Sequence, residues 1–411
     1  MNKHAVVLAA DSATTVSQWT EEGRETRYFK GANKIFQLSE SRPVGIMIYD
    51  SADIMSVPWE TVIKTFRAEL GNKSFNDLDG YKNEFFSFLA EDRRLFPDEI
   101  RVEVLVEAIV RAALGPVFES EDPPAGAERT AFLEALLQDI EEELAELQYV
   151  GSFSDAHAEA ISQAHGAEID EEISGLLEAL KASEIVSVER LRALGISLIL
   201  KKSENHLDTT GLVFAGFGDH SVFPSHISCI SCGLVLGEHV VTSTSHEVVD
   251  HKKPASLRAF AQTSMSETFT LGLSKDVYGS MIASLFDEFN AFAEKLCEAA
   301  GVDKDGIDNL AELVQEARRN VGQTLLNEAS KAHAIPLRRV IGVLPIDEMA
   351  ELAETLVSLQ SLKEKVTKPS ETVGGPVDVA VITKSEGLVW LKRKHYFDLS
   401  LNPRFVKRLG N

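Results

Sequence analysis

The order in which strand-like and helix-like segments follow one another most constrains how this chain of 411 residues can fold. Short apolar or alternating runs typical of strands lie near both ends and in the middle, and two long blocks with helical spacing separate them. A parallel α/β sheet needs a helix after nearly every strand, so this segregated order argues against one. It favours sheets packed face to face, with helical layers outside.

The first strands come within 50 residues. Residues 5–10 form an apolar run that ends at Asp11, residues 34–38 alternate in apolar character, and residues 44–49 follow a turn. We expect these segments to form an early antiparallel meander. Residues 56–70 then change to helical spacing and predict a helix that covers it. Its apolar face consists of Trp59, Val62, Ile63, Phe66 and Leu70.

The rest of the chain continues to alternate between blocks of helical pattern and groups of strand patterns. Residues 74–203 are almost wholly helical in pattern, apart from a Pro-Pro-Ala-Gly loop at 123–126. Strand patterns return at 211–218, 240–242 and 268–272, and helices are predicted over 277–300, 307–332 and 346–365. Residues 377–383 and 388–397 flank a turn and predict a closing hairpin.

The chain is strongly acidic. Its 64 Asp and Glu residues exceed its 41 Lys and Arg residues, giving a net charge of −23, which repels phosphate backbones and anionic lipids. We therefore expect no nucleic-acid partner and no membrane binding. Apolar runs are too short to span a bilayer and the first residues show no secretory cleavage signal, which favours a cytoplasmic location.

Several residue groups resemble metal or cofactor motifs without completing one. Cys229 and Cys232 have the spacing of half a zinc site, but they lie in a strand pattern, where side chains three apart point to opposite faces. His246 and His251 are five residues apart, whereas helical zinc ligands are four apart. We expect buried free thiols, no metal and no cofactor. His220 and His226 flank a Phe-Pro-Ser segment in a predicted loop or strand end, where two interpretations are open: the histidines line a pocket, or they belong to a plain polar loop, which the pattern favours.

Both ends of the chain carry a recognisable succession of motifs. Residues 5–15 contain a strand ending Ala-Ala-Asp-Ser, residues 33–38 a Lys-Ile strand, and residues 45–53 a strand leading to Ala-Asp. Residues 373–387 contain a glycine pair, a strand and a closing turn. In these stretches the chain resembles proteasome β subunits, which belong to the N-terminal nucleophile (Ntn) hydrolases.

The resemblance implies an α+β fold, a four-layer αββα sandwich of the Ntn-hydrolase type with a helical insertion. On this interpretation residues 1–73 form the first part of the sandwich and residues 74–203 a mostly helical, acidic insertion. Residues 204–411 form the second part, which includes the C-terminal hairpin.

The resemblance also implies roles for two residues. In the family a processed N-terminal Thr attacks a peptide carbonyl and its own amine acts as the base. A Lys lowers the proton affinity of that nucleophile and an Asp orients the Lys; Lys34 and Asp11 match these positions. The nucleophile should lie about sixteen residues before Asp11, yet ten residues precede it and none is Ser, Thr or Cys. An ion pair that braces two strands explains Asp11 and Lys34 equally well.

Other positions depart from the family pattern. Asp50 stands where the family usually has Gly beside the oxyanion position, and a carboxylate there opposes a developing negative charge. Ser370 and Val373 stand where the family carries an Asp and a Ser. Cleavage before Thr14 or Thr15 would create a new N-terminal Thr, but it would discard Asp11 and the buried first strand.

Two functions fit these observations. The first is a proteasome β-like protein that has lost peptidase activity and acts as a binding or assembly subunit, with a homo-oligomeric or other protein partner and a peptide-like ligand. The second is an active N-terminal-nucleophile hydrolase, a threonine-type peptidase or amidase, with an upstream start or unusual processing.

Overall fold

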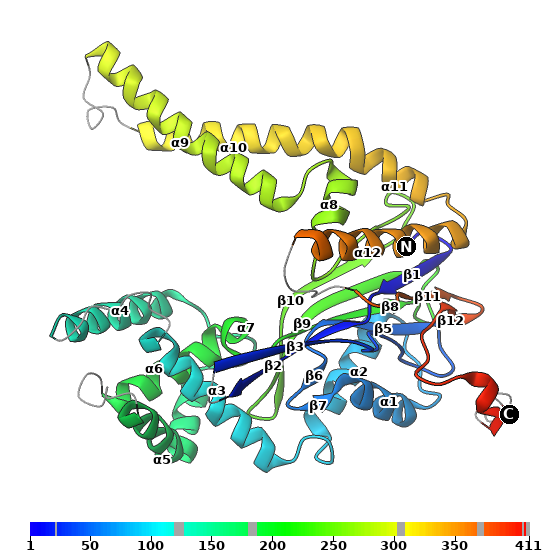
Figure 1. Ribbon diagram of the computed structural model, residues 1–411, viewed down its shortest axis with the longest axis horizontal. Helices are drawn as coiled ribbons and strands as arrows, with labels where there is room; N and C mark the ends of the chain where they lie inside the picture. Colours follow the sequence, from blue (N-terminus) through cyan, green and yellow to red (C-terminus); the bar gives the residue numbers. More distant parts are fainter. Residues whose placement is uncertain are drawn as a thin grey trace.

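The structure is a computed structural model that describes residues 1–20, 23–118, 127–179, 187–301, 309–367, 374–404 and 407. Helices surround small antiparallel sheets (Figure 1), so the predicted α+β class is confirmed. No helix within these ranges is long and apolar enough to cross a membrane.

The largest sheet has five antiparallel strands in the order β10-β9-β8-β5-β4. They are β4 (Ile35–Gln37), β5 (Val44–Asp50), β8 (Thr210–Gly216), β9 (Ser225–Val235) and β10 (Glu238–Val248). In β8 every residue is buried, and in β5 all but the last two are. Burial on both faces explains why these strands form continuous apolar runs in the sequence.

A second, three-stranded sheet joins the two ends of the chain in the order β1-β11-β12. It consists of β1 (Ala5–Ala10), β11 (Asp378–Thr383) and β12 (Gly387–Lys392). β1 pairs antiparallel with β11, whereas β4 pairs with β5. The expected meander is therefore wrong for its first strand, because the ladder partner of β1 lies more than 360 residues away.

One apolar cluster draws side chains from both sheets: Val6, Leu8, Ala10, Ile35, Met47, Val213, Ala215, Ala380 and Ile382. On the other face of the large sheet, α1 (Trp59–Leu70) and α2 (Leu78–Glu91) pack against β5 and β8. The long helix α12 (Ile346–Thr367) lies over β1 and β11 (Figure 1). All five predicted apolar positions of α1 are buried.

The next helices form a core of their own. They are α3 (Asp98–Phe118), α4 (Ala127–Glu146), α5 (Asp155–Ala179), α6 (Val188–Lys201) and α7 (Ser203–His206). Their buried side chains cluster with Cys232, Val235 and Val240 of β9 and β10. Within segment 74–203, α2 thus packs on the sheet with α1, while α3 to α6 pack on one another. The loop expected at 123–126 lies outside the described residues.

A helical hairpin projects from the body of the molecule (Figure 1). It consists of α9 (Lys275–Ala300) and α10 (Leu310–Ala329), preceded by α8 (Ser264–Leu271) and followed by a π-helical turn (Ser330–Ala334) and α11 (Ile335–Ile341). The prediction of a strand at 268–272 is wrong. Residues 268–271 are the last residues of α8, and Gly272 is its C-cap in a left-handed conformation. The hydroxyls of Thr268 and Thr270 donate to carbonyls one turn earlier, which accommodates these threonines in a helix.

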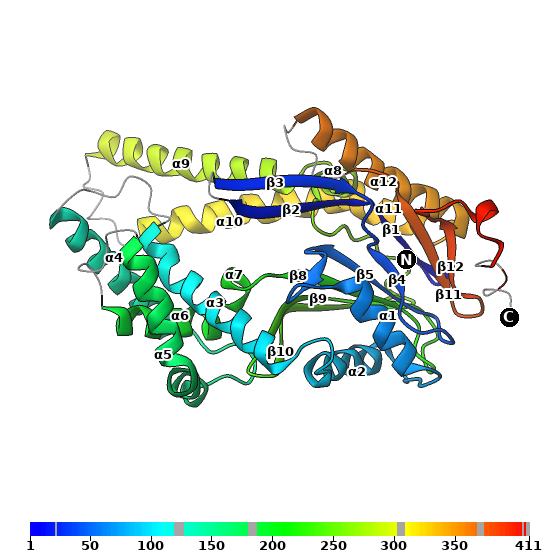
Figure 2. The same ribbon diagram turned by 60° about the horizontal axis from the view of Figure 1, so that its bottom comes forward.

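Shorter elements complete the chain. The strands β2 (Ala13–Thr20) and β3 (Gly23–Lys30) form a hairpin that extends away from the sheets (Figure 2), and the sequence patterns did not predict it. The pair β6 (Asp53–Ile54) and β7 (Val57–Pro58) leads into α1. The closing hairpin is present but ends at Lys392 rather than at 397, and the backbone N–H of Lys394 instead donates to the side chain of Asp378.

Candidate functional site

Asp11 and Lys34 lie together at the end of β1. Asp11 follows the last residue of β1 and Lys34 precedes β4, and the Lys34 Nζ is 2.7 Å from Asp11 Oδ1. The side chain of Lys34 is 19% exposed and that of Asp11 is 11% exposed. The second oxygen of Asp11, Oδ2, accepts hydrogen bonds from the backbone N–H groups of Gly374 (2.7 Å) and Ala13 (3.2 Å). The carboxylate therefore ties three separate segments together.

The glycine pair passes directly beside this carboxylate. The Ser12 N–H donates to the Gly374 carbonyl (3.1 Å), and the Ser12 hydroxyl donates to the Pro376 carbonyl (2.5 Å). Gly375 has a φ of +82°, and a Cβ there would lie 3.0 Å from the Cβ of Lys30, so both conformation and space favour glycine. The ends of the first strand and of the segment that leads into β11 therefore meet beside this carboxylate. Ser370 and Val373 lie outside the described residues.

Asp50 is the last residue of β5 and has a φ of +67°, a region that glycine adopts more readily than other residues. Burial raises the pKa of its carboxyl group, and the nearby positive charge of Lys34 opposes that rise. Among the described residues, no hydrogen bond or salt bridge holds this carboxylate. A second acidic group thus lies close to the Asp11–Lys34 pair.

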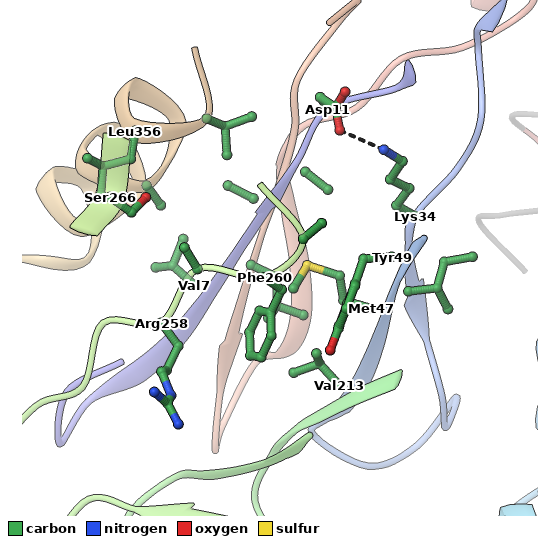
Figure 3. A pocket seen from close by; sticks show the side chains of 18 of the residues that line it. Val7, Asp11, Lys34, Met47, Tyr49, Val213, Arg258, Phe260, Ser266 and Leu356 are labelled. Atoms are coloured by element: carbon green, nitrogen blue, oxygen red, sulfur yellow. Dashed lines mark hydrogen bonds and ion pairs between the residues drawn. The ribbon is translucent and has the colours of Figure 1, made fainter. Parts of the chain in front are cut away.

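A pocket of about 380 Å³ runs along β1 (Figure 3). Its walls come from consecutive residues 6–10 of β1, from β5 and β8, from the coil segment 256–262, and from α12. Asp11 and Lys34 lie at one end of β1 and Arg258 lies near the other (Figure 3). The volume falls in the range of sites that hold small organic ligands.

Aromatic side chains form part of the pocket wall. The rings of Tyr49 and Phe260 stack with their centroids 5.4 Å apart. Tyr49 lies across Gly211 of β8, where an added Cβ would come within 1.9 Å of the tyrosine ring. Burial, followed by the charge of Asp50, raises the pKa of Tyr49 to about 12, so the phenol stays neutral at physiological pH.

His226 also lines the pocket, which confirms for this histidine the pocket-lining interpretation over the polar loop that the sequence pattern favoured. It belongs to β9, is only 6% exposed, and its ring meets Phe260 edge-on at 6.2 Å. Burial lowers the pKa of His226 to about 4. Its Nε2 atom has no hydrogen-bond partner within the described part of the chain. His220, by contrast, is exposed.

The cysteines behave as predicted. Cys229 and Cys232 are buried and free, and they point into different clusters on opposite faces of β9. Burial raises the pKa values of these thiols to about 12 and about 11, so neither is a ready nucleophile. His246 and His251 do not join a metal site: no cluster of three metal-ligating side chains occurs in the ranges that the structure describes.

Comparison with known proteins finds no match to this chain among protein-family models, curated proteins or solved structures. The site combines three features: the Asp11 carboxylate with hydrogen bonds to both oxygens, the nearby carboxylate of Asp50, and the pocket beside β1.

Proposed function

We propose that the protein has the four-layer αββα sandwich of proteasome β subunits and acts in the cytoplasm as a binding or assembly subunit without peptidase activity. The apolar cluster shared by both sheets supports the sandwich, as do α1 and α2 on one outer face and α12 on the other. The three unpaired cysteines suit a reducing compartment. The pocket beside β1 is the proposed ligand site.

The surroundings of Lys34 carry the proposal that the site is not catalytic. Lys34 and backbone N–H groups occupy both oxygens of the Asp11 carboxylate, an arrangement that braces the strands and needs no nucleophile. The neighbouring Ser12 hydroxyl donates a hydrogen bond to the Pro376 carbonyl. Asp50 adds a negative charge near Lys34, where a tetrahedral intermediate would need stabilisation by positive charge or hydrogen-bond donors.

An active N-terminal-nucleophile hydrolase, a threonine-type peptidase or amidase, is the second candidate. The Lys34–Asp11 pair beside a pocket favours it, provided that an upstream start or unusual processing supplies a nucleophile. Cleavage before Thr14 would remove β1 and its ladder with β11, and with it the side chains of Val6 and Leu8 from the shared cluster. That route would destabilise the sheet it depends on.

The helical hairpin supports the assembly part of the proposal. Phe292 and Leu296 of α9 are 65% and 58% exposed, and Leu313 of α10 is 57% exposed. Large apolar side chains gathered on a projecting element are typical of protein–protein contact sites. We propose that a second copy of the chain covers this hairpin. Native mass spectrometry should then show an oligomer, and Phe292→Ser with Leu296→Ser should convert it to the monomer.

Activity measurements test the two candidates against each other. We expect no hydrolysis of fluorogenic peptide substrates and no labelling by a threonine-reactive epoxyketone probe. The variant Lys34→Met should behave like the wild type in both assays. Hydrolysis or labelling that disappears in Lys34→Met, with the variant still folded, would establish the hydrolase instead.

A further inference from the structure

The pocket lies along an unpaired edge of β1. β11 occupies one side of this strand, and on the other side the described residues provide partners only at its beginning. There Asn2 forms a single bridge with Ala255, while Met1 and Ser256 exchange two backbone hydrogen bonds of 2.7 and 2.9 Å. Beyond Ser256 the chain continues as coil, and the pocket separates it from β1.

The two layers of side chains that cover β11 also cover the pocket, so the pocket resembles the place of a further strand in this sheet. Leu356 and Val357 of α12 line it on one side, and Met47 and Val213 of the large sheet line it on the other. β11, on the opposite side of β1, is covered by the same two layers, since Val381 packs with residues of α12 and Ile382 packs with Met47 and Val213. The pocket therefore offers the backbone groups of an edge together with apolar layers above and below, as an added strand requires.

Charges at the two ends of the pocket define a direction. Asp50, without a salt-bridge partner in the described ranges, lies at the Lys34 end. Arg258 lies at the other end, where it forms an ion pair with Glu247 at 3.0 Å. The Nε2 atom of His226, which has no hydrogen-bond partner among the described residues, belongs to the same region. β1 runs from the Arg258 end towards Asp11 (Figure 3). A strand antiparallel to β1 would thus place its amino end at Asp50 and its carboxyl end at Arg258.

We propose that the pocket binds an extended, apolar peptide with a free N-terminal amine, which adds to β1 as an antiparallel strand. Residues 6–10 of β1 line the pocket, and at about 3.3 Å per residue they match a peptide of about five residues. The inference rests on the proposed binding function and assigns the class of ligand. The backbone of β1 supplies affinity, Asp50 binds the amine, and the neutral His226 offers a hydrogen bond near the other end.

Calorimetric titration of the full chain with the pentapeptide Val-Ala-Val-Ala-Leu, carrying free termini, tests the proposal. Two derivatives of this peptide, isomers of each other, bear N-methyl groups either on residues 2 and 4 or on residues 3 and 5. In a paired strand alternate N–H groups face the neighbouring strand and the others do not. We expect one isomer to lose affinity at least tenfold and the other to bind like the parent peptide.

The variant Asp50→Asn tests the direction of binding. Asparagine tolerates a positive φ and keeps the shape of the side chain, so the variant should fold like the wild type. It should bind the free-amine peptide about tenfold more weakly, whereas an N-acetylated peptide should bind both proteins equally. Equal affinity of the free-amine peptide for both proteins would contradict the assigned direction.

The remaining outcomes separate this inference from the function on which it rests. If both N-methylated isomers bind like the parent, the pocket accepts apolar ligands without strand pairing and the inference fails. Absence of binding, with no cleavage of the peptide, also overturns the inference but leaves the lack of peptidase activity intact. Cleavage of the parent peptide would overturn the proposed function itself.

Discussion

Asp11 and Gly374 are 363 positions apart in the sequence, yet the backbone N–H of Gly374 donates to the Asp11 carboxylate at 2.7 Å. The same carboxylate binds Lys34 and receives a hydrogen bond from Ala13. One side chain thus joins the end of β1, the start of β4 and the approach to β11. A brace of this kind keeps the Lys34 end of the pocket in place whether or not the site performs chemistry.

The brace should be measurable as coupling between Asp11 and Lys34. Asp11→Asn keeps an oxygen for the backbone donors but loses the ion pair, and Lys34→Met removes the charge while keeping a long side chain. A double-mutant cycle in urea unfolding should give a coupling free energy of about 1–2 kcal/mol. The pair Lys392–Glu354, in which the lysine is 59% exposed, should give a value near zero. Equal coupling in the two pairs would contradict a structural role.

Burial of His226 should make stability depend on pH. Its pKa is lowered to about 4 in the folded protein, from 6.5 for a solvated histidine. The unfolded chain therefore binds a proton that the folded chain does not, and stability is lost as the pH falls from 6.5 to 4. The variant His226→Gln should lose less stability over this interval, by about 3 kcal/mol. Parallel pH profiles for the two proteins would rule out this contribution.

Gly211 should not tolerate a side chain. The Cβ of Gly211→Ala would lie 1.9 Å from the ring of Tyr49, which would push this ring from its stack with Phe260 in the pocket wall. We expect the variant to be destabilised by about 1–3 kcal/mol. Gly175→Ala in α5 is a matched control, since nothing lies within 4 Å of its added Cβ. A denaturation series that ranks the two variants alike would show that the ring moves freely.

The thiols of Cys229 and Cys232 in β9 should be unreactive in the folded protein. In a Cys297→Ser background, Ellman's reagent should react with Cys229 and Cys232 about a hundredfold more slowly than with free cysteine, because both are buried and their pKa values are raised. Full reactivity should return in denaturant. Rapid labelling of one thiol in native buffer would instead reveal an accessible cysteine on β9.

Features with a local period were predictable from the sequence. The helical spacing from Trp59 to Leu70 identified the buried face of α1, and the strand pattern placed Cys229 and Cys232 on opposite faces of β9. The proximity of Asp11 and Lys34 was also predicted, through the resemblance at both chain ends. The faces of α1 and β9 follow from repeats of 3.6 and two residues, and the proximity of Asp11 and Lys34 follows from recognisable motifs.

Features that depend on tertiary partners were not predictable. Nothing near Ala5 in the sequence indicates that it pairs with Thr383, because tertiary packing decides which strand a given strand pairs with, and the local pattern does not. Thr268 and Thr270 favour strands, yet they lie in α8, whose first turn is hydrogen-bonded to Gln360 of α12 through Met265. The segment 256–262 has no period at all, so its place in the pocket wall could not be foreseen.

The intact mass of the protein purified from its own cells is the most direct test of the central claim that the site has no N-terminal nucleophile. We predict a chain that retains β1 and begins with a residue other than Thr, Ser or Cys. A mature chain that begins with one of these three residues, and that reacts with the epoxyketone probe through its N-terminal side chain, would contradict the account.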